Sequence, residues 1–217
     1  MPVNLGKQYR HYIDTETTGL DPSLHELLEV AIVTEEVSES APFERSLTTV
    51  WSTKILPERI HINEPKALEV NGYTPEKWEG AKPFGEVAAT IAEKLKNGVI
   101  VGHNVRFDLD FLQAAFKGVG IDPQLPYHNI DTVTLAYEHW ALSGECARVS
   151  LDPLRVHLGL TLAQHHSAVK DALDCREVFY RALAPSWSRF FQRMVSSYTR
   201  RFQLRWWLLR HMMSFLD

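Results

Sequence analysis

Short apolar runs separated by turn signals organise the first part of this chain. The runs at 8–14, 26–35 and 46–55 predict three strands, although the length of the second run also fits a helix. Because these runs follow one another closely, we expect the strands to pair antiparallel. Shorter runs at 99–101 and 127–130 predict a fourth and a fifth strand.

Helical periodicity lies between and after these strands. Five segments are predicted to be helical: 65–70, 84–96, 106–117, a segment that begins after Asp131, and one that runs from Ser167 to about Leu183. The first of them ends at Asn71-Gly72, a pair typical of a helix terminus. Helical crossovers would then carry the chain to the last two strands. The pattern predicts an α/β fold, a mixed five-stranded sheet flanked by helices.

A break at Pro185-Ser186 divides the chain into two parts of opposite charge. Residues 186–217 hold six of the 23 basic residues and one of the 27 acidic ones. Their charge is therefore near +5, and that of residues 1–185 is near −9, although the whole chain carries only −4. We predict a domain at 1–185 and a C-terminal extension at 186–217. An acidic body suits a pocket that binds metal, provided that basic side chains nearby guide a phosphate substrate.

The extension is basic and aromatic, and its large apolar residues recur at roughly helical spacing. One or two helices are therefore expected. They could pack on the domain or on a second copy of the chain, which would make a homodimer. Arginines interleaved with aromatic residues could instead grip single-stranded nucleic acid. Docking to a partner protein or a membrane surface is the third alternative.

The cysteine content and the lengths of the apolar runs bear on where in the cell the protein is expected. Cys146 and Cys175 have no zinc-ligand spacing and are too few for a disulfide framework, which favours a reducing environment. The chain start lacks an apolar core of signal-peptide length, and no apolar run is long enough to cross a bilayer. We expect a cytoplasmic protein without a transmembrane segment.

Three short segments carry the candidate chemistry. Asp14 and Glu16 end the first predicted strand, two positions apart, so both side chains point to one face. The second segment contains two aspartates, Asp108 and Asp110, and helix geometry alone does not choose between them. The third segment, near the start of the last predicted helix, contains His165, His166, Asp171 and Asp174.

Carboxylates gathered in a fold repel one another, and divalent metal is the usual remedy. Ligand sets made only of oxygen suit magnesium or manganese. A histidine beside such a cluster adds a base that titrates near neutral pH. Taken one at a time, however, each of these residues is as typical of a solvated surface or a helix cap.

Together the three segments resemble the three motifs of the DEDDh 3′→5′ exonucleases, whose relatives include the proofreading subunits of bacterial replicative polymerases. Asp14-Thr-Glu16-Thr-Thr-Gly resembles the first motif, Gly-His-Asn-x-x-Phe-Asp108 the second and His166-x-Ala-x-x-Asp171-Ala the third. The resemblance selects one residue from each open pair: Asp108 rather than Asp110, His166 rather than His165, and Asp171 rather than Asp174.

The resemblance covers roughly residues 8–183 and implies a ribonuclease H-like fold. Ser167 stands where the tyrosine branch of the superfamily carries its tyrosine, so the histidine branch is indicated. One departure is Asn71, where relatives often have histidine before the glycine.

The resemblance also implies a metal-dependent nuclease with two Mg²⁺, for which Mn²⁺ can substitute. Asp14 would bridge the metals, Glu16 and Asp171 would complete the site that binds the attacking water, and Asp108 would serve the second metal. His166 would be the general base. The expected reaction is hydrolysis of phosphodiester bonds at 3′ ends, with release of nucleoside 5′-monophosphates.

The expected substrate is the single-stranded 3′ end of a nucleic acid, preferably DNA. Its candidate contacts follow the resemblance. Thr17 and Thr18 would meet the terminal nucleotide next to Gly19, and Leu20 would wedge between the last two bases. Three further candidates are less specific: Ile62, which like its neighbour His61 could cover the terminal base, and His103 and Asn104, which could equally be loop residues that bond the backbone.

Three alternative functions stay open at this point. The chain could be a proofreading subunit docked to a polymerase, or an exoribonuclease that trims RNA 3′ ends, because DNA and RNA members share the motifs. A module that binds nucleic acid without cutting it is the alternative outside enzymes.

Overall fold

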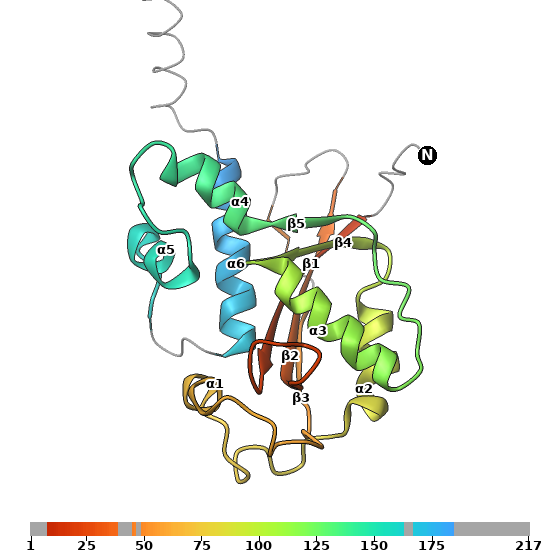
Figure 1. Cartoon of the computed structure of the whole chain (residues 1–217). Coiled ribbons are helices and arrows are strands. Elements are labelled where there is room, and N and C mark those ends of the chain that lie inside the picture. Colours follow the sequence, from red (N-terminus) through yellow and green to blue (C-terminus); the bar gives the residue numbers. More distant parts are fainter. Residues whose placement is uncertain (1–7, 39–44, 47–48, 163–166, 185–217) are drawn as a thin grey trace, which may run out of the picture. The chain divides into compact units, whose positions relative to one another are not determined.

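The computed structural model describes residues 8–38, 45–46, 49–162 and 167–184. Five strands and seven helical segments alternate along this part of the chain (Figure 1). In chain order they are β1 Gln8–Thr17, β2 Leu27–Val37, β3 Thr49–Lys54, α1 Pro65–Asn71, α2 Phe84–Lys94, β4 Gly98–Gly102, α3 Val105–Gly118, β5 Asn129–Asp131, α4 Thr132–Ala136, η1 Tyr137–Ala141, α5 Leu151–Leu158 and α6 Ala168–Leu183.

The strands of this described part form one mixed sheet in the order β3-β2-β1-β4-β5. β1 pairs antiparallel with β2, and β2 pairs antiparallel with β3. β4 and β5 are parallel to β1 and follow helical crossovers. The mixed five-stranded α/β fold predicted from the sequence is therefore confirmed, including the antiparallel pairing of the first three strands. The carboxyl ends of β1 and β4 meet at one edge of the sheet, where ligands bind in many α/β proteins.

Helices cover both faces of the sheet (Figure 1), and an apolar layer lies between the sheet and the helices on each face. Alternate residues of β1 and β2 point to opposite faces. Ile13 and Ile32 pack with α2 and α3, whereas Tyr12 and Val33 pack with α6. Each of these four side chains is at most 1% exposed. The helices that carry the later motifs are thus fixed on a buried sheet.

A buried ion network anchors α6 to the sheet. Glu35 of β2 is fully buried and accepts hydrogen bonds from Arg176 of α6 at 2.7 Å and from Tyr12 at 3.0 Å. Burial alone would raise the pKa of Glu35, but hydrogen bonds from Tyr180, Arg176 and Tyr12 hold it below its usual range. The carboxylate therefore stays ionised and pairs with Arg176 and Arg10.

Most predicted elements occur with shifted ends. β1 continues through Glu16 to Thr17, three residues past its predicted end. Gly72 ends α1 in the left-handed conformation, and the side chain of Asp131 caps α4 by accepting a hydrogen bond from the Val133 amide. The sequence did not predict the π-helical turn η1 or the helix α5.

No helix within the described ranges is both long and apolar enough to cross a membrane. The predicted extension at 186–217 lies outside the described residues, so its helices and its partners stay predictions.

Candidate metal centre

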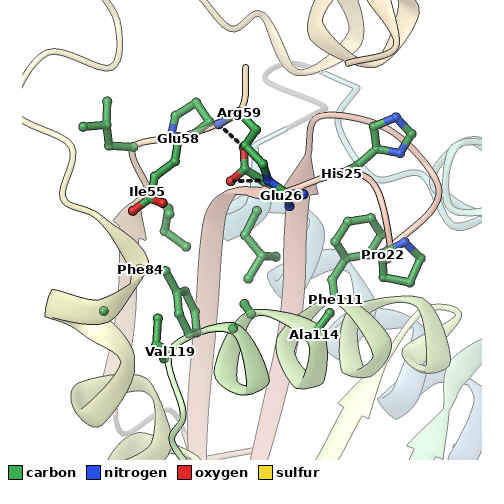
Figure 2. A pocket seen from close by; sticks show the side chains of 16 residues that line it. Pro22, His25, Glu26, Ile55, Glu58, Arg59, Phe84, Phe111, Ala114 and Val119 are labelled. Atoms are coloured by element: carbon green, nitrogen blue, oxygen red, sulfur yellow. Dashed lines mark hydrogen bonds and ion pairs between the residues drawn. The ribbon is translucent and has the colours of Figure 1, made fainter. Parts of the chain in front are cut away.

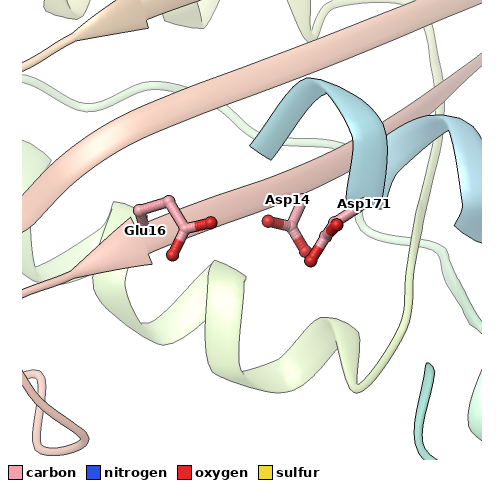
Figure 3. A group of neighbouring side chains, drawn as sticks. All are labelled: Asp14, Glu16 and Asp171. Carbon is pink, nitrogen blue, oxygen red and sulfur yellow. The ribbon is translucent and has the colours of Figure 1, made fainter. Parts of the chain in front are cut away.

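Three carboxylates from elements far apart in the sequence meet near the carboxyl end of the central strand β1 (Figure 3). Asp14 and Glu16 come from β1, and Asp171 comes from the first turn of α6. One oxygen atom of each lies within 4.8 Å of the others, which is close enough for a shared cation. All three side chains are partly exposed, so a metal could reach them from solvent.

Asp108 lies against this group from the first turn of α3. It is 4% exposed, and its Oδ1 accepts a 2.8 Å hydrogen bond from the Thr15 hydroxyl. Its charge acts on Asp14 and Glu16, but it is not within the 4.8 Å group. Asp110 instead pairs with Arg106 on the outer side of α3, at 2.9 Å. The geometry thus brings Asp108, and not its neighbour, to the other carboxylates.

The proximity of these carboxylates raises their proton affinity. Loss of hydration raises the pKa of Asp14 well above its usual range, and the charges of Asp108, Asp171 and Glu16 raise it further. The same causes raise the pKa of Glu16 to about 8, and the partner of Glu16 across the sheet, Glu29, contributes. Burial raises the pKa of Asp108 to about 7, although the bond from Thr15 opposes the shift. Such a cluster stores repulsion that a divalent cation relieves.

The metal-free protein is therefore expected to lose stability against unfolding as the pH rises from about 5 to about 9. The folded-state pKa values of Glu16 and Asp108, about 8 and about 7, lie above the ordinary values of roughly 4. Stability from such groups is complete below the ordinary pKa and is lost as the pH rises through the folded value. We expect the Tm in EDTA to fall by roughly 5 °C or more.

Thermal melts at pH 5, 7 and 9, with EDTA or with saturating Mg²⁺, measure this dependence. Mg²⁺ should remove most of the fall, because it takes the place of the protons. A Tm in EDTA that does not change between pH 5 and pH 9 would contradict the described electrostatics.

The two aspartates of α6 have different environments. Asp171 faces Asp14 (Figure 3), whereas Asp174 is 5% exposed and pairs with Lys170 and, at 2.6 Å, with Arg155. Arg155 of α5 is 1% exposed, and its Nη2 also donates to Asp171 Oδ1 at 2.5 Å. Asp171 is therefore both a member of the carboxylate group and a partner of a buried guanidinium.

The loop after Glu16 is fixed mostly by bonds within the protein. The register of β1 and β2 shifts between Glu16 and Thr17, and the Thr17 hydroxyl donates to the Gly19 carbonyl at 2.7 Å. Thr18 is fully buried, and its hydroxyl accepts from the Glu26 amide at 2.9 Å. A Cβ at Gly19 would lie 2.6 Å from the His25 ring, so any larger residue there would require the ring to move.

Leu20 and Asn71 complete this loop in different ways. Leu20 is 69% exposed, so its side chain projects into solvent beside the carboxylates' strand. The Asn71 side chain donates to the Thr17 carbonyl at 2.9 Å. The departure noted from the sequence thus has a structural role, because Asn71 ties the end of α1 to β1.

The remaining predicted site residues are held by local contacts. His103 Nδ1 lies 2.9 Å from the Thr132 hydroxyl, and burial lowers the pKa of the ring. Asn104 precedes α3 in the left-handed conformation and is exposed, and Ile62 is partly buried with its carbonyl 3.5 Å from the Thr18 hydroxyl. His166, the predicted general base, lies outside the described residues.

A separate cavity of about 380 Å³ lies between the β1–β2 loop, the segment after β3, and helices α2 and α3 (Figure 2). Phe84 and Phe111 line its apolar side, and an ion pair between Glu26 and Arg59 crosses its rim. None of the three carboxylates of Figure 3 lines this cavity. The candidate metal ligands therefore lie at the carboxyl end of β1, outside this cavity.

Sequence reasoning did not find Thr15, Glu29 and Arg155. Thr15 points away from Asp14 and Glu16 along β1, so its bond to Asp108 depends on where α3 packs. Glu29 lies opposite Glu16 because of the register in which β1 and β2 pair, which the sequence alone does not give. Arg155 lies in a segment that the sequence did not predict to be helical, and because arginine is rarely buried, no local signal indicates its burial.

Comparison with known proteins supports a nuclease. The family model described as Exonuclease matches residues 12–179. The PolC-type DNA polymerase III of Thermotoga maritima is 35% identical over 170 residues, which cover 78% of this chain but 11% of that protein. The DNA polymerase III subunit epsilon of Treponema pallidum is 29% identical over 171 residues, 79% of this chain and 74% of that protein.

Solved structures show the same fold. The chain resembles E. coli exonuclease I in complex with a dT13 oligonucleotide, with a TM-score of 0.69 and 19% identity. The match covers 87% of this chain and 43% of that one. The ribonuclease H-like architecture expected from the sequence is therefore confirmed.

Proposed function

This chain belongs to the exonuclease family, and we propose that it is a metal-dependent 3′→5′ exonuclease of the DEDDh type that acts on single-stranded DNA ends. The observation that carries the proposal is the convergence of Asp14, Glu16 and Asp171, which are up to 157 positions apart in the sequence, within 4.8 Å. Residues so far apart meet only in the folded domain, near the carboxyl end of β1, and ligands bind at the carboxyl ends of strands in many α/β proteins.

The donor set of the site fits hard divalent cations. Carboxylate oxygens are the ligands that Mg²⁺ and Mn²⁺ prefer, and loss of hydration together with neighbouring carboxylates raises the pKa of Asp14 and of Glu16. We propose that Asp14, Glu16 and Asp171 hold two Mg²⁺ together with Asp108. When bound, such a pair activates a water and stabilises the charge that develops on the leaving oxygen.

The protein residues have distinct roles in the proposed reaction. His166 accepts a proton from the water that attacks the phosphorus of the last phosphodiester. The bond from that phosphorus to the O3′ atom of the preceding nucleotide breaks, this O3′ takes up a proton from solvent, and a nucleoside 5′-monophosphate leaves. Asp108 is oriented by Thr15, and Asp171 by the anchored helix α6. Correct orientation of these groups before substrate binds lowers the entropic part of the barrier.

We assign the contact with the 3′-terminal nucleotide to the loop after Glu16. The hydroxyls of Thr17 and Thr18 are engaged within the protein, so the exposed side chain of Leu20 is the stronger candidate for stacking against a base. An apolar contact of this kind accepts any base. Ile62, His103 and Asn104 remain weaker candidates.

Cleavage by this protein is expected to require a divalent cation. With a 5′-labelled single-stranded oligonucleotide, Mg²⁺ should produce a ladder that shortens by one nucleotide at a time from the 3′ end. EDTA should stop the reaction, and excess Mg²⁺ or Mn²⁺ should restore it. DNA and RNA of the same sequence, tested in parallel, determine the sugar preference.

A circular single strand is the matched control, because it has no 3′ end. Cutting of the circle, or a ladder in EDTA, would contradict the proposal. Binding of the linear oligonucleotide without cleavage at any metal concentration would instead support a binding module.

A role beside a polymerase is a second candidate, favoured by the names of the relatives. The chain spans 11% of the length of the PolC-type proteins and 74% of the epsilon subunit that it matches. A chain of this size could serve as a proofreading subunit, with residues 186–217 as the segment that binds a partner or a second copy. Co-purification with and without residues 186–217 tests this role.

A further inference from the structure

Arg155 is a buried cation at the edge of the carboxylate group. Its guanidinium is 1% exposed and donates from three different nitrogen atoms. Nε bonds to Asp174 at 2.6 Å, Nη1 to Asp152 at 2.6 Å and Nη2 to Asp171 at 2.5 Å. Burial of an arginine is costly unless anionic partners neutralise its charge. One of the three partners here, Asp171, is a residue of the proposed metal centre.

Two of these three pairs have an evident structural purpose. Asp152 lies on α5 with Arg155, three positions away, and Asp174 lies on the inner face of α6. The bond to Asp174 is enough to join the two helices. The bond to Asp171 is not needed to join the helices. It places the charge of Arg155 on Oδ1 of a carboxylate that faces Asp14 (Figure 3).

We propose that Arg155 is a resident counter-ion of the metal centre: it partly neutralises the carboxylates when metal is absent and thereby lowers the affinity of the site for divalent cations. The inference rests on the proposed function, in which Asp171 is a metal ligand. Arg155 thus acts through Asp171 and is a positioning residue.

Removal of Arg155 would change metal affinity in two opposite ways, through the orientation of Asp171 and through the local charge. Loss of orientation at Asp171 would weaken metal binding, but α6 is anchored and an aspartate has few rotamers. Loss of a unit charge beside a dication relieves a repulsion that is large at the effective dielectric constant of a protein, about 20. The charge effect should therefore dominate, and metal should bind more tightly.

The experiment measures Mn²⁺ affinity by titration calorimetry in the full-length chain, for the wild type and for Arg155→Met. We expect Arg155→Met to bind Mn²⁺ about tenfold more tightly. Its metal-free form should melt at a lower temperature than the wild type, and saturating Mn²⁺ should raise its Tm by more than it raises that of the wild type. Arg155→Lys keeps the charge, so its Kd should stay within about threefold of the wild-type value.

Asp174→Asn is the control for a purely structural role. It breaks the buried pair that joins α5 to α6 but leaves the bond between Arg155 and Asp171 in place. Its Mn²⁺ affinity should stay the same or weaken, because Arg155 keeps more uncompensated charge. Tighter binding by Asp174→Asn would mean that loosened helices cause the effect, which would overturn the proposal.

The remaining outcomes separate this inference from the proposed function. If the wild type does not bind Mn²⁺, or if Asp14→Asn leaves its binding unchanged, the metal centre itself is wrong. If the wild type binds at that centre but Arg155→Met binds equally or more weakly, only the counter-ion role is wrong. Should Arg155→Met and the neutral polar variant Arg155→Gln both fail to fold even in saturating Mn²⁺, metal does not replace the missing charge, and the proposal fails.

Discussion

Replacing Asp14 by asparagine is expected to reduce the rate of 3′-end cleavage by at least roughly 10³-fold, since it removes a carboxylate that would hold the divalent cations of the proposed centre. The same change should stabilise the metal-free protein at pH 8. Loss of hydration and three neighbouring carboxylates raise the pKa of Asp14, so its ionised form is unfavourable in the folded state. An asparagine of the same shape removes that charge. Single-turnover cleavage of a labelled strand and thermal melts in EDTA measure the two effects.

Asp110→Asn is the matched control for this substitution. Asp110 lies on the outer side of α3, where its partner is the exposed Arg106. Surface ion pairs of this kind contribute little, so the rate and the Tm should stay close to those of the wild type. A wild-type rate in Asp14→Asn, or equal losses in both variants, would show that the carboxylate group is not the catalytic centre.

Replacing His166 by alanine is expected to slow cleavage by about 10²–10⁴-fold, the usual contribution of a positioned general base. In contrast to Asp14→Asn, this variant should keep its affinity for Mn²⁺, because the imidazole is not among the proposed metal ligands. The rate of His166→Ala should also recover partly as the pH rises, since hydroxide becomes more abundant in solution. Pre-steady-state rates across pH 6 to 9, with Mn²⁺ titrations, distinguish a lost base from a lost ligand.

His165→Ala is the comparison that decides between the two adjacent histidines. It should cleave at nearly the wild-type rate if His166 is the base. If His165→Ala is the slow variant and His166→Ala is not, the resemblance to the third motif has selected the wrong residue.

The apolar pattern was enough to predict the sheet, because buried strands such as β2 leave a continuous hydrophobic run. It could not predict α5, a helix of eight residues with Pro153 inside it and the buried Arg155 on its inner side. Nor could it predict η1, since a π-helical turn has no period that short segments reveal. The apolar run that predicted β1 stops at Asp14, because the polar residues Thr15, Glu16 and Thr17 that complete the strand do not continue it.

The candidate site was predicted as a set of motifs but not as a set of contacts. The resemblance to the three motifs selected Asp14, Glu16 and Asp171, and the structure brings them together. The neighbours that tune them come from packing and register: Thr15 beside Asp108, Glu29 across from Glu16, and Arg155 beside Asp171. These contacts have no signature in a single sequence, because each depends on how two separate elements meet.

Asp14 and Glu16 of the proposed centre come from the first strand of the described residues, and Asp171 comes from the last helix. A ribosome therefore has to release nearly the whole domain before Asp171 can join Asp14. Until then the growing polypeptide lacks one side of the chelating group, and the parallel pairing of β1 with β4 also waits for distant residues. Because Asp171 comes late in the sequence, a partly synthesised chain cannot yet assemble the proposed metal centre.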